Sequence, residues 1–287
     1  MATKTTGADI TENKDGDGLL STLLPVIYNL RPAYLLSLLI ALLIGIASIA
    51  ALLYPNAIYP TAELRRSFLA NDVVNLVIGL PILIGSMWLT RRGKLIGLLF
   101  WPGALFYGFY NYMAYLFAMP LNAIFLFSLT IVTLSVYTLI GLVASIDGQS
   151  VKNRLNGRVP ERFAGGVLIG FGALFILRAF AVIVSALANQ TPTAGPELAL
   201  LAVDFIASPA WIIGGVLLWR RQALGYVGGT GLLFQASMLF IGLIAILILQ
   251  PFLSDVPFLP LDVIVVFVMG LICFIPFVLF VRGVVKS

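Results

Sequence analysis

Eight apolar blocks of roughly 20 residues divide the chain, and each is long enough to cross a membrane as a helix. A helix satisfies its own backbone hydrogen bonds in lipid, so continuous blocks of this length predict helices and not barrel strands. Only 10% of the residues are charged, whereas a soluble chain carries about 25%. The sequence therefore predicts an all-α polytopic membrane protein. The expected spans are approximately 33–54, 72–90, 94–118, 120–145, 163–187, 198–219, 223–250 and 261–282.

One pattern occurs twice in the chain: a Pro-Thr-Ala triplet, an acidic residue, a proline and a double arginine. The first copy contains Pro60-Thr61-Ala62, Asp72, Pro81 and Arg91-Arg92. The second contains Pro192-Thr193-Ala194, Asp204, Pro209 and Arg220-Arg221. The copies are 132 residues apart at the acidic residue but 129 apart at the arginines, so Asn75 competes with Asp72 as the counterpart of Asp204.

This duplication predicts two four-helix repeats, 31–148 and 161–287, joined by a polar linker at 149–160. Because each repeat holds an even number of spans, both insert with the same orientation, as parallel repeats. Residues 1–18 are polar and are expected to be a disordered N-terminus, while 19–32 are expected to lie at the membrane interface.

The basic residues gather on one side of this predicted topology. The positive-inside rule then places both termini in the cytoplasm, and the expected location is a plasma (inner) membrane. The residues expected to face inward are Lys4, Lys14, Arg31, Arg91, Arg92, Lys94, Lys152, Arg154, Arg158, Arg162, Arg220, Arg221, Arg282 and Lys286; Arg65 and Arg66 face outward. Topology thus accounts for the net charge of +5, and no nucleic-acid partner is predicted.

The two double arginines have two interpretations. They bind anionic lipid headgroups at the inner surface, which would make Arg91, Arg92, Arg220 and Arg221 lipid-binding residues, or they serve only as topology signals.

The absence of histidine excludes many kinds of chemistry. Histidine-ligated haem, histidine zinc sites and Ser-His-Asp catalysis all need it, and the single cysteine, Cys273, allows no intrachain disulfide. No cofactor and no metal site is predicted, and the composition argues against an enzyme.

Charged residues deep in a span are costly and are candidates for function. Arg178 lies ~24 Å from the inner end of its span, and Asp204 lies ~22 Å from the inner end of the next one. The matched depths predict an ion pair between them. Asp72 instead has a second interpretation, as a cap near the start of its helix. Together, the candidate ligand-binding residues in the outer half are Arg178, Asp204, Asp72, Asn75, Asn111, Gln235 and Tyr107.

Three functions fit this cluster of polar residues. The first is a transporter-like or ligand-binding protein for a small polar or anionic solute that enters from the outer face. The alternative is a non-catalytic scaffold, in which the ion pair is structural and the chain binds a membrane protein partner or forms a homo-oligomer. The third is an intramembrane enzyme that uses Asp and Tyr.

Overall fold

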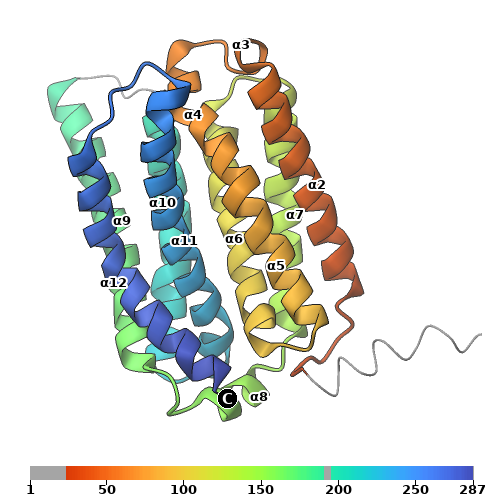
Figure 1. Cartoon of the computed structure of the whole chain (residues 1–287). Coiled ribbons are helices and arrows are strands. Elements are labelled where there is room, and N and C mark those ends of the chain that lie inside the picture. Colours follow the sequence, from red (N-terminus) through yellow and green to blue (C-terminus); the bar gives the residue numbers. More distant parts are fainter. Residues whose placement is uncertain (1–23, 191–194, 287) are drawn as a thin grey trace, which may run out of the picture.

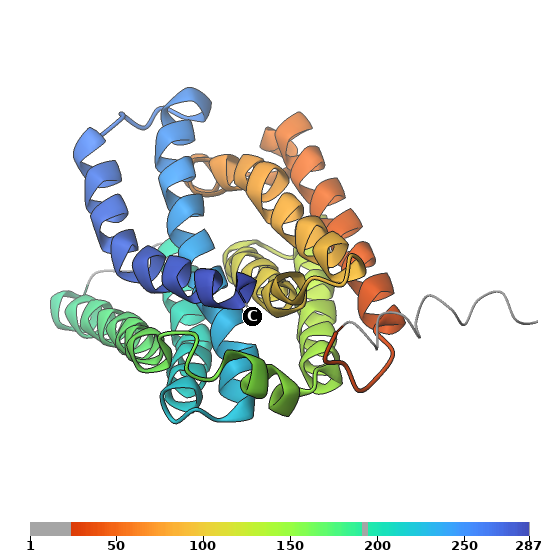
Figure 2. The same ribbon diagram turned by 60° about the horizontal axis from the view of Figure 1, so that its bottom comes forward.

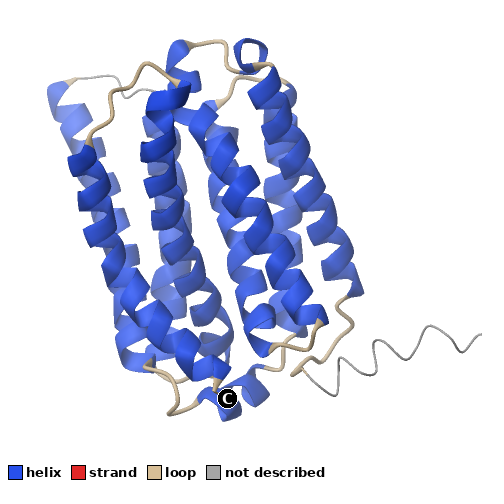
Figure 3. Cartoon of the chain, viewed as in Figure 1, coloured by secondary structure: helices blue, strands red, loops and turns tan. Residues whose placement is uncertain are grey.

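The computed structural model describes residues 24–190 and 195–286, and within them the chain is helical, with no strand (Figure 3). The predicted disordered segment, 1–18, and the triplet at 192–194 lie outside the described residues. The helices are α2 (Arg31–Leu53), α3 (Pro55–Ile58), α4 (Ala62–Val74), the π-helical segment η1 (Asn75–Gly79), α5 (Leu80–Arg91), α6 (Leu95–Ala118), α7 (Ala123–Ser145), α8 (Gly148–Leu155), α9 (Glu161–Asn189), α10 (Gly195–Trp219), α11 (Ala223–Leu253) and α12 (Pro260–Val285).

The long helices run antiparallel in one bundle, as expected for a multi-pass membrane protein (Figure 1). Within the described residues, seven helical segments are long and apolar enough to cross a membrane: 31–53, 62–91, 123–145, 161–189, 195–219, 223–253 and 260–285. The eighth predicted span, 94–118, folds as α6, but its Tyr, Trp, Gly and Asn residues make it less apolar than the others.

Helix α6 occupies the centre of the bundle, packed against α5, α7, α10 and α11 (Figure 2). Most of its side chains are buried, including those of Trp101, Tyr107 and Asn111. A helix enclosed by other helices does not need an apolar surface, because protein and not lipid surrounds it. Its polar residues therefore lie where they can meet polar residues from both halves of the chain.

The second span begins ten residues earlier than the sequence predicts, at Ala62 instead of Asp72. Thr61 caps the helix by accepting a hydrogen bond from the Leu64 amide at 3.2 Å, and Glu63 lies in the first turn. The polar outer turns concealed this start. The capping interpretation of Asp72 is thus wrong, because Asp72 lies well inside the helix.

The middle of this span is a π-helical turn, Asn75–Gly79, in which the Leu80 amide bonds the Asn75 carbonyl. A π turn accommodates an extra residue in a helix and often occurs at a functional position. Pro81 follows directly, at the start of α5, where its missing amide hydrogen costs least.

The chain turns with the same geometry directly after Arg91-Arg92 and at Arg220-Arg221. In the first, Lys94 and Gly93 donate to the carbonyls of Leu89 and Thr90. In the second, Gln222 and Arg221 donate to those of Leu217 and Leu218. Both follow the Schellman pattern, with Gly93 (φ 69°) and Arg221 (φ 55°) in the left-handed region.

The backbones of α6 and α11 approach each other closely at Gly103 and Gly231. A Cβ added to Gly103 would stand 2.2 Å from the Gly231 carbonyl oxygen, so the two backbones are in direct contact. Gly103 and Gly231 are separated by 128 residues, the same separation as Gly93 and Arg221. This separation differs by one residue from the 129 of the double arginines, and the two-repeat architecture stays a prediction.

The predicted linker is partly ordered and holds the lower end of the bundle together. Asp147 caps α8 by accepting hydrogen bonds from the Ser150 hydroxyl and amide. These hydrogen bonds lower the pKa of the Asp147 carboxyl. Glu161, buried in the first turn of α9, accepts hydrogen bonds from the Gly157 amide at 2.8 Å and the Tyr226 hydroxyl at 3.0 Å. These contacts fix the start of α9 against α11.

Candidate functional site

The predicted ion pair forms between α9 and α10. Arg178 Nη1 lies 2.7 Å from Asp204 Oδ2, and Tyr110 of α6 donates its hydroxyl to Asp204 Oδ1. Asp204 is buried, with 1% of its side chain exposed, while the Arg178 side chain is 46% exposed. The carboxylate is therefore enclosed, whereas nearly half of the Arg178 side chain is exposed.

A second carboxylate, Asp72, has a network of its own on the other half of the chain. Tyr59, from the loop before α4, donates to Asp72 Oδ2, and Tyr115 of α6 donates to Asp72 Oδ1 at 3.0 Å. The Asn71 amide donates in turn to the Tyr115 hydroxyl at 3.2 Å. No ion pair involving Asp72 occurs within the described residues, so hydroxyl groups alone satisfy this carboxylate.

The two acidic networks meet α6 on different faces. Tyr110 and Tyr115 are five residues apart, which separates them by ~7.5 Å along the helix and by about 140° around it. The structure therefore does not bring Asp72 and Asp204 into one contact set. They are two networks on opposite sides of a shared helix, and we call them the Asp72 network and the Asp204 network.

Three of the remaining candidates lie between these networks at the contacts of α6 with η1 and α11. Tyr107 packs between the backbones of η1 and α11. A Cβ added at Gly79 of η1 would stand 3.5 Å from its ring, and a Cβ added at Gly242 of α11 would stand 2.7 Å from its hydroxyl. Asn75 is buried in η1, near Gly79. Asn111 donates to the Tyr107 carbonyl at 3.0 Å and so bonds its own helix.

Two buried amide groups in this region have hydrogens without a protein partner. Trp211 donates to the Gln235 side-chain oxygen at 2.7 Å, which leaves the Gln235 Nε2 unpartnered, and the Asn75 Nδ2 is likewise unpartnered. Buried polar groups are nearly always satisfied, by protein, water or ligand. Both groups are therefore candidate donors to a bound polar molecule or to water.

The depth of Arg178 makes its exposure notable. It lies 11 residues before the C-terminal end of α9, or ~17 Å along the helix. An arginine reaches the polar interface by snorkelling only when it is near a helix end, and a charge at the bilayer centre is costly. A charged side chain that is half-exposed at this depth calls for water, an anion or lipid rearrangement beside it.

The double arginines lie in the turns at the lower end of the bundle. Arg92 packs over the Trp88 ring at 4.1 Å and Arg91 over the Tyr34 ring at 5.6 Å. Arg221 lies 3.7 Å from Glu161, and Arg220 follows α10. Their binding to lipid headgroups stays a prediction.

Known proteins give no guide to this chain. No protein-family model matches it, and no curated protein or solved structure is significantly similar to it. Within residues 24–190 and 195–286, no three Asp, Glu or Cys side chains group closely enough to hold a metal ion. The chemistry must therefore be argued from the two networks themselves.

Sequence reasoning missed Tyr59, Tyr110 and Tyr115 as partners of the acids. Helix α6 is buried on several sides, and its tyrosines contact different neighbours: Tyr110 bonds Asp204, whereas Tyr115 bonds Asp72. Tyr59 could not be predicted as a partner, because no sequence pattern indicates that a loop tyrosine contacts an aspartate 13 residues later.

Proposed function

We propose that this chain binds a small polar or anionic solute through the Asp204 network, as a transporter-like membrane protein would. The observation that carries the proposal is the half-exposed side chain of Arg178, far from either end of α9. A charge in that position is expensive unless it serves a ligand or an aqueous path.

The proposal includes an orientation. All eight long passes would cross the membrane, including α6, whose lower apolarity is shielded by its neighbours. The described termini lie at the lower end in Figure 1, together with most of the basic residues. By the positive-inside rule that end would be cytoplasmic, in a plasma (inner) membrane, and both acidic networks would lie in the outer half.

The roles follow from the geometry. Arg178 has further guanidinium hydrogens beyond the one on Asp204, and an arginine fork can bind a carboxylate or phosphate with two parallel hydrogen bonds. Asp204 would hold the guanidinium in place. Asp72, which lies on the other side of α6 and has only hydroxyl partners, would bind a coupling cation and not the solute itself. Asn75 and Gln235 would supply amide donors, with Tyr107 and Asn111 shaping the passage.

A thermal-stability screen of the purified protein tests this binding. Acetate and phosphate are suitable probes, with sodium chloride at equal ionic strength as the reference. An anion at 100 times its Kd stabilises a protein by about 2.7 kcal/mol, which raises the Tm by several degrees. We expect this rise in the natural chain and its loss in the Arg178→Gln/Asp204→Asn variant, which removes both charges of the pair together.

Arg221→Gln is the matched control, because Arg221 is also half-exposed and also lies beside a buried carboxylate. It should keep the full rise. The proposal would be contradicted by anions that stabilise no better than chloride, or by a rise that survives in the double variant. The ion pair would then be structural, which favours the scaffold interpretation.

A further inference from the structure

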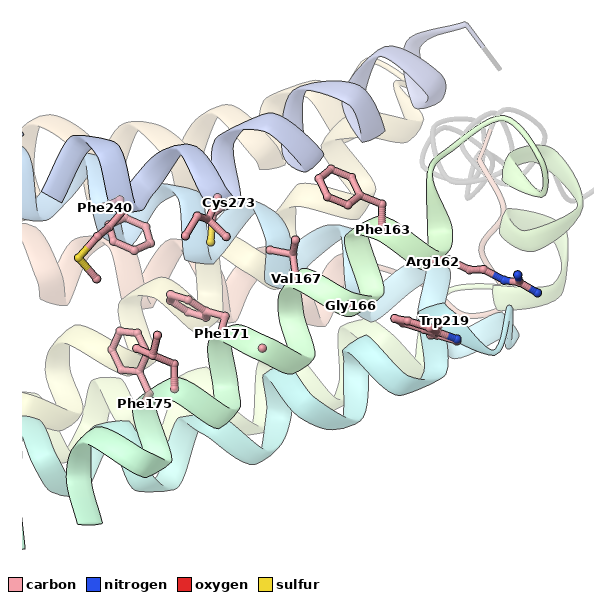
Figure 4. Close-up of a pocket in the computed structure, with 13 residues that line it drawn as sticks. Arg162, Phe163, Gly166, Val167, Phe171, Phe175, Trp219, Phe240 and Cys273 are labelled. Atoms are coloured by element: carbon pink, nitrogen blue, oxygen red, sulfur yellow. The ribbon is translucent and has the colours of Figure 1, made fainter. Parts of the chain in front are cut away.

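An apolar groove runs along the outside of the bundle between α9 and α12, with α11 at its base (Figure 4). Its volume is about 690 Å³, within the range of ligand sites. Phe171, Phe175, Phe240 and Cys273 form its deeper wall, while Phe163 and Ile272 at its edge are exposed. The groove is therefore open to the surroundings of the bundle, which for spans of this kind is lipid.

The groove has the length of one leaflet. It extends on α9 from Arg162, in the first turn, to Phe175, which is ~20 Å of helix. Half of a ~30 Å hydrocarbon core is about 15 Å. The groove thus begins at the lower surface of the bundle and ends near its middle.

The cross-section of the groove indicates what fits in it. A volume of about 690 Å³ over ~20 Å gives a mean section of roughly 35 Å². A helix with a diameter of about 10 Å has a section of roughly 80 Å², so a helix from a second copy or from another protein would enter the groove with only part of its surface. A single hydrocarbon chain is the narrower occupant that a membrane supplies.

The open end of the groove carries a free positive charge. Arg162 extends past the groove's end in Figure 4, is exposed, and has no ion-pair or hydrogen-bond partner within the described residues. Its neighbour Glu161 points inward, held by Gly157, Tyr226 and Arg221. Trp219, the other residue at this end, has the indole ring typical of the headgroup level.

We propose that this groove binds one acyl chain of an anionic phospholipid from the leaflet at the basic end, with the lipid phosphate on Arg162. The apolar wall selects for a hydrocarbon chain, and the unpaired guanidinium selects for a negative headgroup. This site is separate from the Asp204 network and does not depend on the proposed solute binding. None of the residues that line the groove belongs to the Asp204 network.

Native mass spectrometry of the full chain, purified with equal amounts of phosphatidylglycerol and phosphatidylcholine, tests the site. We expect one tightly retained phosphatidylglycerol per chain. Arg162→Gln should reduce the preference for phosphatidylglycerol by about fivefold, the usual effect of one basic residue near a charged surface. Gly170→Phe should displace the lipid, because a side chain there meets open space inside the groove.

Two control variants match these changes. Arg154→Gln removes an exposed arginine at the same end, and Gly141→Phe adds a ring at an exposed glycine of α7 that also meets open space. Both should retain the lipid as the natural chain does. Equal retention of the two lipids by the natural chain, or undiminished retention by Gly170→Phe, would overturn the proposal. A homodimer without bound lipid would also overturn the proposal, because a second copy of the chain would then occupy the groove.

Discussion

Replacing Gly103 by alanine is expected to destabilise this protein more than any other single methyl group added to it. The new Cβ would stand 2.2 Å from the Gly231 carbonyl oxygen, and backbone on both sides leaves no flexible side chain to move away. Overpacking usually costs about 1–3 kcal/mol, and here we expect at least the upper value, because the α6–α11 contact must open. Thermal unfolding in detergent, followed by the loss of the monodisperse peak, measures it.

The same crossing provides its own graded controls. Gly231→Ala should cost less, because its Cβ would meet Gly103 N at 3.0 Å. Gly228→Ala lies on the same helix, meets nothing within 4 Å, and should be neutral or slightly stabilising. If Gly103→Ala were as stable as Gly228→Ala, the backbone contact between the two halves would not exist as described.

Replacing Arg178 by alanine is expected to have the second largest effect. The substitution leaves the buried carboxylate of Asp204 with only the Tyr110 hydroxyl. Removing one partner of a buried ion pair costs about 3–5 kcal/mol, and the exposure of Arg178 places the expected loss at the lower end of this range. Adding Asp204→Asn should restore part of the stability, because it removes the unpaired charge and keeps an acceptor for Tyr110.

A double-mutant comparison of melting temperatures checks this account. Arg221→Ala is the reference for a half-exposed arginine at a longer distance, 3.7 Å from Glu161, and should cost less than about 1 kcal/mol. If the Arg178→Ala/Asp204→Asn variant is no more stable than Arg178→Ala alone, then the buried charge is not the source of the loss.

The sequence was most informative where depth along a helix decides the contact. Arg178 and Asp204 could be paired because consecutive antiparallel helices bring equal depths together, and the ion pair confirms this. The ends of most spans were also predicted to within a few residues. The ion pair and the ends of the spans both depend on the length of the apolar segments, which can be read directly from the sequence.

The sequence was least informative where packing around α6 decides the contact. Which tyrosine meets which aspartate depends on how this buried helix is rotated, and its apolar pattern does not show that, because several faces are covered. The early start of α4 was hidden by its polar turns, and the Asp72 network includes a loop residue, Tyr59. The α9–α12 groove depends on how α9 and α12 are placed relative to each other, and the spacing of residues in the sequence does not predict that.

Access of water to the level of Arg178 is the most direct test of the proposed function. In a Cys273→Ala background, a single cysteine would replace Arg178 together with Asp204→Asn, which avoids an unpaired buried charge. A membrane-impermeant thiol reagent would then be applied to each face in turn. Because the reactive form is the thiolate, labelling requires water at the thiol. Leu177→Cys in the same background is the control for a highly exposed, lipid-facing neighbour.

We predict rapid labelling at position 178 from the face opposite the basic end, and none at position 177. That result would place water beside the Asp204 network and favour a solute site. No labelling at position 178 from either face, in a folded protein, would contradict the proposal, because the guanidinium would then face lipid and the ion pair would serve only to hold α9 against α10.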